Sequence, residues 1–113
     1  MHEGGEGKTQ VIAVYRPKAG KDAELRELMK EHVPILRRLG LATDDPAISM
    51  IAQDGTIVET FAWVSTEAIE RAHSHPDVLA MWARYDACCE YGRLADLAET
   101  GQMFPGFTPL YVS

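Results

Sequence analysis

The fold is decided by residues 63–82, which read WVSTEAIERAHSHPDVLAMW. A β-rich run ends at Trp63, and the acidic segment that follows is typical of a short helix. Ser65 or Thr66 is suited to cap this helix, because a hydroxyl oxygen can accept a hydrogen bond from a free backbone N–H of the first turn. The stretch therefore predicts a strand followed at once by a short helix that ends at His73.

The second half of the stretch predicts another helix. Pro76 is favoured at the first position of a helix, and Ser74 or His75 can serve as its cap. Trp82 and Tyr85 fall on the same arc of this helix. Aromatic, apolar and imidazole groups so close together are the usual lining of a small-molecule pocket.

Three strands are predicted before this stretch. Asp54-Gly55 is a strong two-residue hairpin signal between strands over residues 47–53 and 56–64. Residues 9–16 are β-branched and aromatic, which predicts a first strand that Pro17 ends.

The first strand is apolar on both faces. Val11, Ala13 and Tyr15 share one face, and Ile12 and Val14 share the other. Both faces are therefore expected to be covered, one by helices and the other by a second sheet, for which a partner subunit is the natural source.

Residues 22–39 predict the longest helix. Asp22 lies in the first turn, where the helix dipole favours a carboxylate, and Gly40 is a natural stop. Apolar residues and one histidine recur at helical spacing: Leu25, Leu28, Met29, His32, Val33, Leu36 and Leu39. Pro34 lies inside this pattern and is expected to kink the helix or to leave the carbonyl of Lys30 without a donor.

The order of elements is β-α-β-β-α(α)-β. Residues 92–101 are weakly patterned, and residues 108–112 predict a final strand that Pro109 confines to a sheet edge. This order is typical of a ferredoxin-like α+β sandwich, with an antiparallel sheet and helices on one face. We expect one domain over residues 9–113, a disordered leader over residues 1–8, and a homodimer that covers the free sheet face.

Composition excludes several classes of function. The net charge of −6 argues against nucleic-acid binding, which needs clustered cations. No apolar run approaches the roughly 20 residues of a membrane helix, and the N-terminal residues lack the apolar core of a signal peptide, so we expect a cytoplasmic protein that binds no membrane. The adjacent Cys88 and Cys89 are expected to be reduced helix thiols, since a disulfide between neighbours would be strained.

Several short motifs carry a resemblance to a known family. They are FAW at 61–63, STE at 65–67, AHSHP at 72–76 and the aromatic helix that follows. Most of residues 9–91 resembles the antibiotic-biosynthesis-monooxygenase-like group of dimeric α/β-barrel proteins. The resemblance implies a ferredoxin-like dimer whose ligand cavity lies between the sheet and its helices. Members of the group include cofactor-free monooxygenases of polyketide quinones, haem-degrading enzymes, and isomerase-like and decarboxylase-like relatives.

Haem degradation does not suit this sequence. The haem-degrading members rely on an asparagine in the first strand, and this chain contains no asparagine. They also have a tryptophan in the short helix and a histidine late in the next one, and both are missing here. We therefore expect no cofactor.

His32 and Glu59 are the candidate catalytic residues. His32 lies on the apolar arc of the long helix and could act as a base near neutral pH, or could be a structural buried histidine. Glu59 shares a strand face with Phe61 and Trp63, so this carboxylate needs a partner. If that face is turned toward the helices, Glu59 can orient the ring of His32; if it faces a partner sheet, it bonds across the dimer.

The candidate substrate-binding residues are Trp63, His73, His75, Trp82 and Tyr85. The two histidines could instead be cap residues, and the aromatic residues could be core. No third ligand follows the histidine pair at a fixed spacing, so we expect no metal site.

Two functional hypotheses follow. The first is a small-molecule-binding homodimer that acts as a cofactor-independent monooxygenase on an aromatic or enolic substrate. The alternative is a non-catalytic ligand-binding or stress-associated dimer, whose ligand would also be small and apolar or aromatic.

Overall fold

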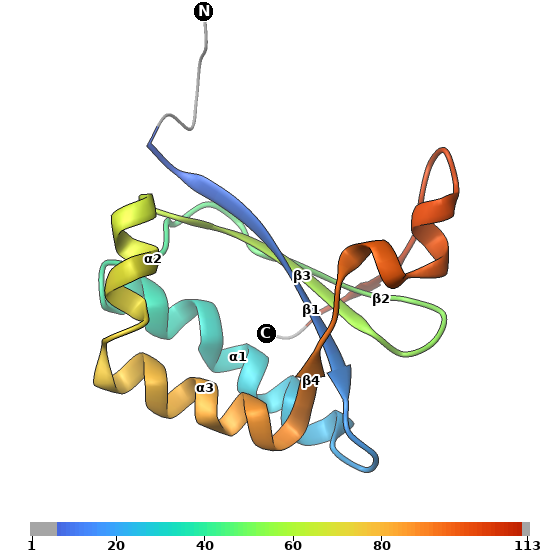
Figure 1. Cartoon of the computed structure of the whole chain (residues 1–113), viewed down its shortest axis with the longest axis horizontal. Coiled ribbons are helices and arrows are strands. Elements are labelled where there is room, and N and C mark those ends of the chain that lie inside the picture. The colour runs from blue at the N-terminus through green and yellow to red at the C-terminus, as the bar shows by residue number, and fades with distance from the viewer. Residues whose placement is uncertain (1–6, 112–113) are drawn as a thin grey trace, which may run out of the picture.

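The computed structural model describes residues 7–111 and shows an antiparallel five-stranded sheet with helices on one face (Figure 1). The strands are β1 (Thr9–Pro17), β2 (Ile48–Ile51), β3 (Ile57–Trp63), β4 (Cys89–Tyr91) and β5 (Thr108–Leu110). The helices are α1 (Asp22–Arg38), α2 (Thr66–Ala72) and α3 (Pro76–Cys88), followed by two short 3₁₀ turns, Leu94–Asp96 and Ala98–Gly101. The predicted α+β, ferredoxin-like class is confirmed.

The sheet order is β4-β1-β3-β2-β5. The first four strands have the order expected of a ferredoxin-like sheet, and β5 extends it beyond β2. The predicted hairpin joins β2 and β3, where Gly55 takes a φ of +90° that a residue with a side chain rarely adopts. In the register of β1 with β3, Ala13 lies opposite Glu59 and Tyr15 lies opposite Ile57.

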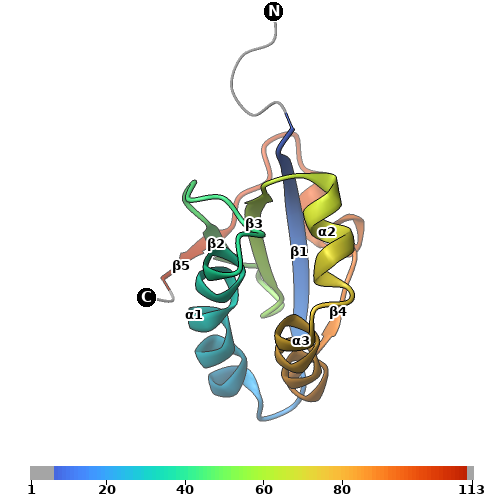
Figure 2. The same ribbon diagram turned by 90° about the vertical axis from the view of Figure 1, so that its left-hand side faces the viewer.

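The helices begin and end close to where the sequence predicts. Helix α1 starts at Asp22 and continues through Pro34 to Arg38, and Gly40 follows with a φ of +75°. Ser65 caps α2 by accepting a hydrogen bond from the amide of Ala68. Helices α1 and α3 pack side by side over the same face of the sheet (Figure 2), and the main core lies between them and the sheet.

The strand that completes the ferredoxin-like sheet is not the one that the sequence predicts. Three residues directly after α3 form β4 and pair with the end of β1, whereas the predicted final strand is β5, at the opposite edge of the sheet. Cys89 therefore begins a strand, and only Cys88 is a helix thiol; both are free. The buried side chain of Cys89 fits a helical stripe as well as a strand face, so periodicity could not separate the two.

The second face of the sheet is covered in part by the chain itself. Leu97, in the segment after β4, packs with Val58 and Ala52 in a small second core. Figure 1 shows this segment on the side of the sheet away from the helices. The expectation that only another sheet would cover this face was therefore wrong for the part over which the weakly patterned segment folds back. The uncovered part carries Ile12 and Ile48, which are 53% and 54% exposed.

The predicted leader falls largely outside the described residues, since residues 1–6 and 112–113 are not described. Lys8, which the prediction included in the leader, forms an exposed ion pair of 3.2 Å with Asp45. Within residues 7–111, no helix has the length and apolar character that crossing a bilayer requires.

Candidate functional site

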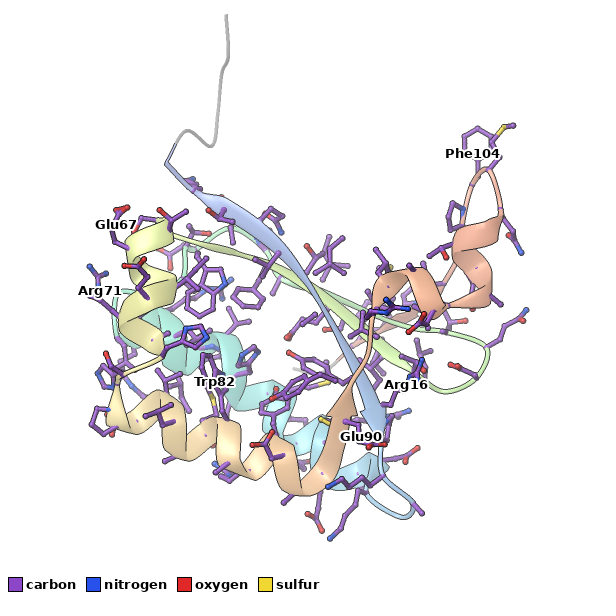
Figure 3. The ribbon with its side chains drawn as sticks, viewed as in Figure 1. Arg16, Glu67, Arg71, Trp82, Glu90 and Phe104 are labelled. Carbon is purple, nitrogen blue, oxygen red and sulfur yellow. The ribbon has the colours of Figure 1, made fainter. Side chains whose placement is uncertain are left out.

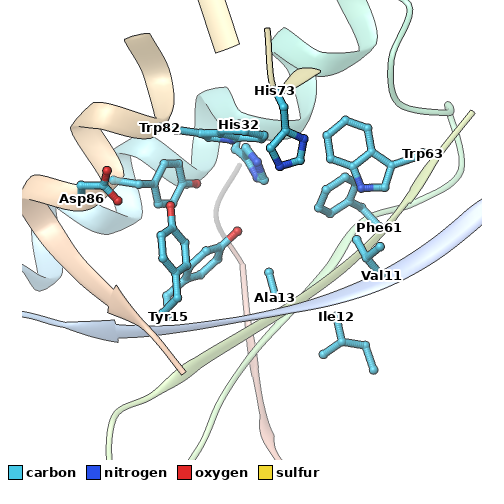
Figure 4. A pocket seen from close by; sticks show the side chains of 12 residues that line it. Val11, Ile12, Ala13, Tyr15, His32, Phe61, Trp63, His73, Trp82 and Asp86 are labelled. Carbon is cyan, nitrogen blue, oxygen red and sulfur yellow. The ribbon is translucent and has the colours of Figure 1, made fainter. Parts of the chain in front are cut away.

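A cavity of about 410 Å³ opens between the sheet and the helices (Figure 4). Its volume lies within the range of about 300–1,000 Å³ that is usual for small-molecule sites. The wall is mainly aromatic, with two imidazoles and one carboxylate. The lining residues are Val11, Ile12, Ala13, Tyr15, His32, Phe61, Trp63, His73, Trp82, Tyr85, Asp86 and Tyr91. Ile12 borders the cavity from β1, but its side chain points to the other face of the sheet (Figure 4).

His32 reaches the cavity from the buried face of α1. Its side chain is almost wholly enclosed, with the residue 4% exposed. Its ring lies edge-on to the rings of Phe61 and Tyr85, with centroid distances of 5.3 and 5.2 Å. Its Nδ1 lies 2.9 Å from Oε1 of Glu59. Both neighbouring rings and the carboxylate hold the imidazole in one orientation.

Glu59 lies on the sheet face that is turned toward the helices, and this decides between the two orientations that the sequence left open. It is 1% exposed, and its Oε1 accepts a hydrogen bond of 2.8 Å from the hydroxyl of Tyr15. Because Oε1 is the acceptor for Tyr15, we assign the proton of the His32 contact to Nδ1 of the ring. The opposite ring nitrogen, Nε2, is then left as the proton acceptor on the cavity side.

Glu59 does not line the large cavity. It borders a second one, of about 340 Å³, between α1, β2 and β5, where Ser49 is its neighbour across the strands. Lys30 and Pro34 line the same cavity. Since Pro34 has no N–H, the carbonyl of Lys30 lacks its helical donor on this wall.

Tyr85 carries an unsatisfied polar group. Its hydroxyl is the only buried side-chain nitrogen or oxygen without a hydrogen-bond partner among residues 7–111. Buried polar groups are nearly always paired, so such an exception needs an explanation. Burial, followed by the charge of Glu59, raises the pKa of Tyr85 far above its usual value, and the nearby Tyr15 hydroxyl opposes this shift by a smaller amount, so the hydroxyl remains a neutral donor. A ligand oxygen in the cavity would give it a partner.

Tyr15 was missed as a site residue by the sequence analysis. Its ring lies 5.1 Å from that of Tyr85, and burial raises its pKa well above 10.0, with Glu59 adding to the effect. The alternation in the first strand places Tyr15 on the helix-facing side. Only the register of β1 with β3 makes it the diagonal neighbour of Glu59.

The two remaining histidines have different positions. His73 lines the cavity, donates from Nδ1 to the carbonyl of Ile69 at 2.7 Å and lies edge-on to Trp82. His75 lies outside the cavity wall, where its Nδ1 accepts from the amide of Asp77 and caps α3. The structure thus brings four of the five predicted binding residues to one cavity and leaves His75 in the capping role.

Asp86 and Tyr91 also line the cavity, and the sequence analysis did not select either of them. Asp86 directly follows Tyr85 on α3, and Tyr91 belongs to β4, the strand that was not predicted. Within residues 7–111, no three His, Cys, Asp or Glu side chains cluster as the ligands of a metal ion would.

No protein-family model and no curated protein sequence matches this chain. Its structure is similar to that of SnoaB, a cofactor-independent oxygenase from Streptomyces nogalater, with a TM-score of 0.65 and 15% sequence identity over 76% of this chain and 87% of that one. A point variant of SnoaB gives a TM-score of 0.64 at the same identity and coverage. At this identity the likeness shows the fold, and it agrees with the ferredoxin-like architecture described above.

Proposed function

We propose that this protein binds a small aromatic molecule and oxygenates it without a cofactor, with His32 as the base. The observation that carries the proposal is the pair of His32 and Glu59. One nitrogen of the imidazole is anchored on a buried carboxylate, and the other is left for a substrate in an aromatic cavity. This is the usual arrangement of a histidine base and the group that orients it.

The proposed reaction begins with the removal of a proton from an enolisable carbon by Nε2 of His32. Glu59 stabilises the imidazolium that forms, and the hydroxyl of Tyr85 donates a hydrogen bond to the enolate oxygen. The enolate carbon gives an electron to O₂, and the two radicals combine to a peroxide. Loss of the second C–H proton then breaks the O–O bond. The CH₂ group becomes a carbonyl, the second oxygen atom leaves as water, and O₂ is the only oxidant.

Two further observations support this proposal. The protein that shares the fold is described as a cofactor-independent oxygenase. The cavity wall is mainly aromatic, which suits a flat substrate. The non-catalytic alternative predicts binding of the same class of ligand without consumption of O₂.

The test is an oxygen-electrode assay with anthrone, a three-ring ketone that has an enolisable CH₂ group. We expect the protein to accelerate O₂ uptake, and His32→Gln to lower the rate by about 10²–10⁴-fold, which is the usual contribution of a general base. The matched control is His75→Gln, a histidine outside the cavity wall, which should keep the rate of the parent protein. Equal rates for the parent and His32→Gln would remove His32 from the mechanism.

We also propose that the protein is a homodimer joined through the uncovered part of the second sheet face. Ile12 and Ile48 both lie opposite Thr60 in their strand pairs, so these residues of three adjacent strands form one exposed patch. Exposed apolar surface of this kind favours a partner, and a twofold axis would place the same patch on both sides.

A further inference from the structure

The large cavity has a charged group in its wall that the proposed reaction does not use. Of the 12 residues that line the cavity, Asp86 is the only one with a fixed charge, because the wall has no lysine and no arginine. Within residues 7–111, the carboxylate of Asp86 takes part in no ion pair and no side-chain hydrogen bond. Lys18 does contact this residue, but its ammonium donates to the main-chain carbonyl at 2.8 Å.

Two aromatic residues of the cavity wall are neighbours of Asp86. Trp82 lies one helical turn before Asp86 on α3, so both side chains lie on the same side of the helix. Tyr91 lines the same wall from β4, and burial together with the charges of Cys89 and Asp86 raises its pKa to about 12. Figure 4 shows Asp86 at the end of the cavity opposite Trp63, with His32 between them.

We infer that the cavity takes an aromatic ligand that carries a protonated amine. The ammonium would lie against the Asp86 carboxylate and the faces of Trp82 and Tyr91, while the phenolic or enolic oxygen would lie at His32 and Tyr85. The placement of the ligand oxygen at His32 and Tyr85 rests on the proposed function. The positive charge on the ligand is what this inference adds.

Electrostatics favours this class of ligand over the alternatives. An ammonium gains from a carboxylate and from the negative face of an aromatic ring at the same time. A carboxylate or phosphate on the ligand would meet the like charge of Asp86 with no cation in the wall to bind it. The net charge of −6 acts in the same direction, because it attracts cations to the protein surface and repels anions.

The experiment measures the affinity of three matched probes by calorimetry in the absence of turnover. Serotonin carries an ammonium, hydroxytryptophol replaces it with a neutral hydroxyl, and hydroxyindoleacetate replaces it with a carboxylate. We expect serotonin to bind about five- to tenfold more tightly than hydroxytryptophol at low salt, as one exposed carboxylate and two aromatic faces predict. Hydroxyindoleacetate should bind most weakly.

The variant Asp86→Asn should remove the preference for serotonin and leave the affinity for hydroxytryptophol unchanged. The matched control is Glu70→Gln, which changes the net charge equally at an exposed position outside the cavity wall. Raised salt should also reduce the preference, because the charge pair is partly screened.

A different result overturns the inference. A cation site at Asp86 would be excluded by equal affinity for serotonin and hydroxytryptophol, or by a failure of all three probes to bind. It would also be excluded if Asp86→Asn kept the preference for serotonin, or if Glu70→Gln lost this preference as well. The anthrone assay is independent, since anthrone has no amine. Oxygenation of anthrone without a serotonin preference would retain the proposed function and reject the amine.

Discussion

At the residue scale, the site depends on one oxygen atom. Oε1 of Glu59 accepts from both His32 and Tyr15 in a setting that excludes bulk water. A buried carboxylate is costly unless it is paired, so both contacts are needed to keep it there. The same contacts orient the base, so stability and the proposed chemistry depend on the same group.

The unpaired hydroxyl of Tyr85 leads to a prediction with opposite effects on stability and binding. Leaving a buried polar group unsatisfied costs about 1–3 kcal/mol, so Tyr85→Phe should unfold at an equal or higher urea concentration than the parent. The affinity for hydroxytryptophol should fall about five- to tenfold, as one lost hydrogen bond predicts.

Tyr15→Phe is the contrasting variant for this prediction. It removes a hydrogen bond to a buried carboxylate, and we expect a loss of about 1.5–3 kcal/mol in the free energy of unfolding. Destabilisation of Tyr85→Phe by a similar amount would show that the Tyr85 hydroxyl has a structural partner.

The raised pKa values predict a loss of stability in alkali. Burial raises the pKa of Tyr15 and Tyr85, raises that of Tyr91 to about 12 and raises that of Cys89 to about 11. In the unfolded chain these groups lose their protons near pH 8.5–10, so above this range the folded state binds more protons than the unfolded state. The contribution of these groups to the free energy of unfolding should therefore be constant below about pH 8, and the free energy should fall as the pH rises toward 12.

Urea midpoints measured at intervals from about pH 8 to pH 11 would check this prediction. Tyr91→Phe should show a shallower decline than the parent, because one of the titrating groups is gone. A midpoint that stays constant across the range would contradict the burial-driven shifts.

At the element scale, the caps of α2 and α3 separate structural from functional polar residues. Ser65 caps α2 and His75 caps α3, each of them one of the two candidates that the sequence offers. Neither residue lines the large cavity. In this chain, the histidine that directly precedes Pro76 at the start of α3 is a cap residue and not a cavity residue.

His75→Ala should reduce the free energy of unfolding by about 0.5–1 kcal/mol, at the low end for the loss of a cap. Affinity for hydroxytryptophol should not change, since the residue lies outside the cavity wall. Ser65→Ala is the matched cap deletion on α2 and should cost a similar amount. Chemical denaturation would measure the free energy of unfolding, and calorimetry on the same samples would measure the affinity for hydroxytryptophol. Weaker binding of hydroxytryptophol by His75→Ala would support the substrate-binding role predicted for His75.

Local sequence patterns predicted the longer strands but not the short strand that completes the ferredoxin-like sheet. The β2–β3 hairpin and β1 are strongly patterned, and the sequence predicted them within a few residues. Strand β4 has three residues and takes its conformation from pairing with the end of β1. A strand so short has no alternation to detect, and its position depends on a contact between distant parts of the chain.

At the scale of the whole molecule, the segment after β4 covers one part of the second sheet face and leaves another part exposed. Its 3₁₀ turns place Leu97 over the sheet, whereas the loop beyond them carries Met103 and Phe104, which are 87% and 85% exposed. Figure 3 shows Phe104 at the tip of this loop, away from the body of the protein. Apolar side chains in such positions support a second copy as the missing neighbour.

The dimer is tested by sedimentation at micromolar concentration. We expect the parent protein to sediment as a dimer and Ile48→Lys to sediment as a monomer, because a charge in the centre of an apolar interface would be buried without a partner. Leu79→Lys, at an exposed position on α3, is the control and should remain a dimer. A parent protein that is monomeric at this concentration would contradict the proposal.

Local patterns in the sequence predicted the helices, the candidate cap residues, the hairpin, the α+β class and the apolar arc on which His32 lies. These features follow from spacing and backbone preferences within a few residues of each other. The tertiary structure alone decided which way Glu59 faces, that Tyr15 joins it, and that Asp86 and Tyr91 line the cavity. Each of these depends on strand register or on a contact between residues far apart in the chain, and local patterns carry no information about such pairings.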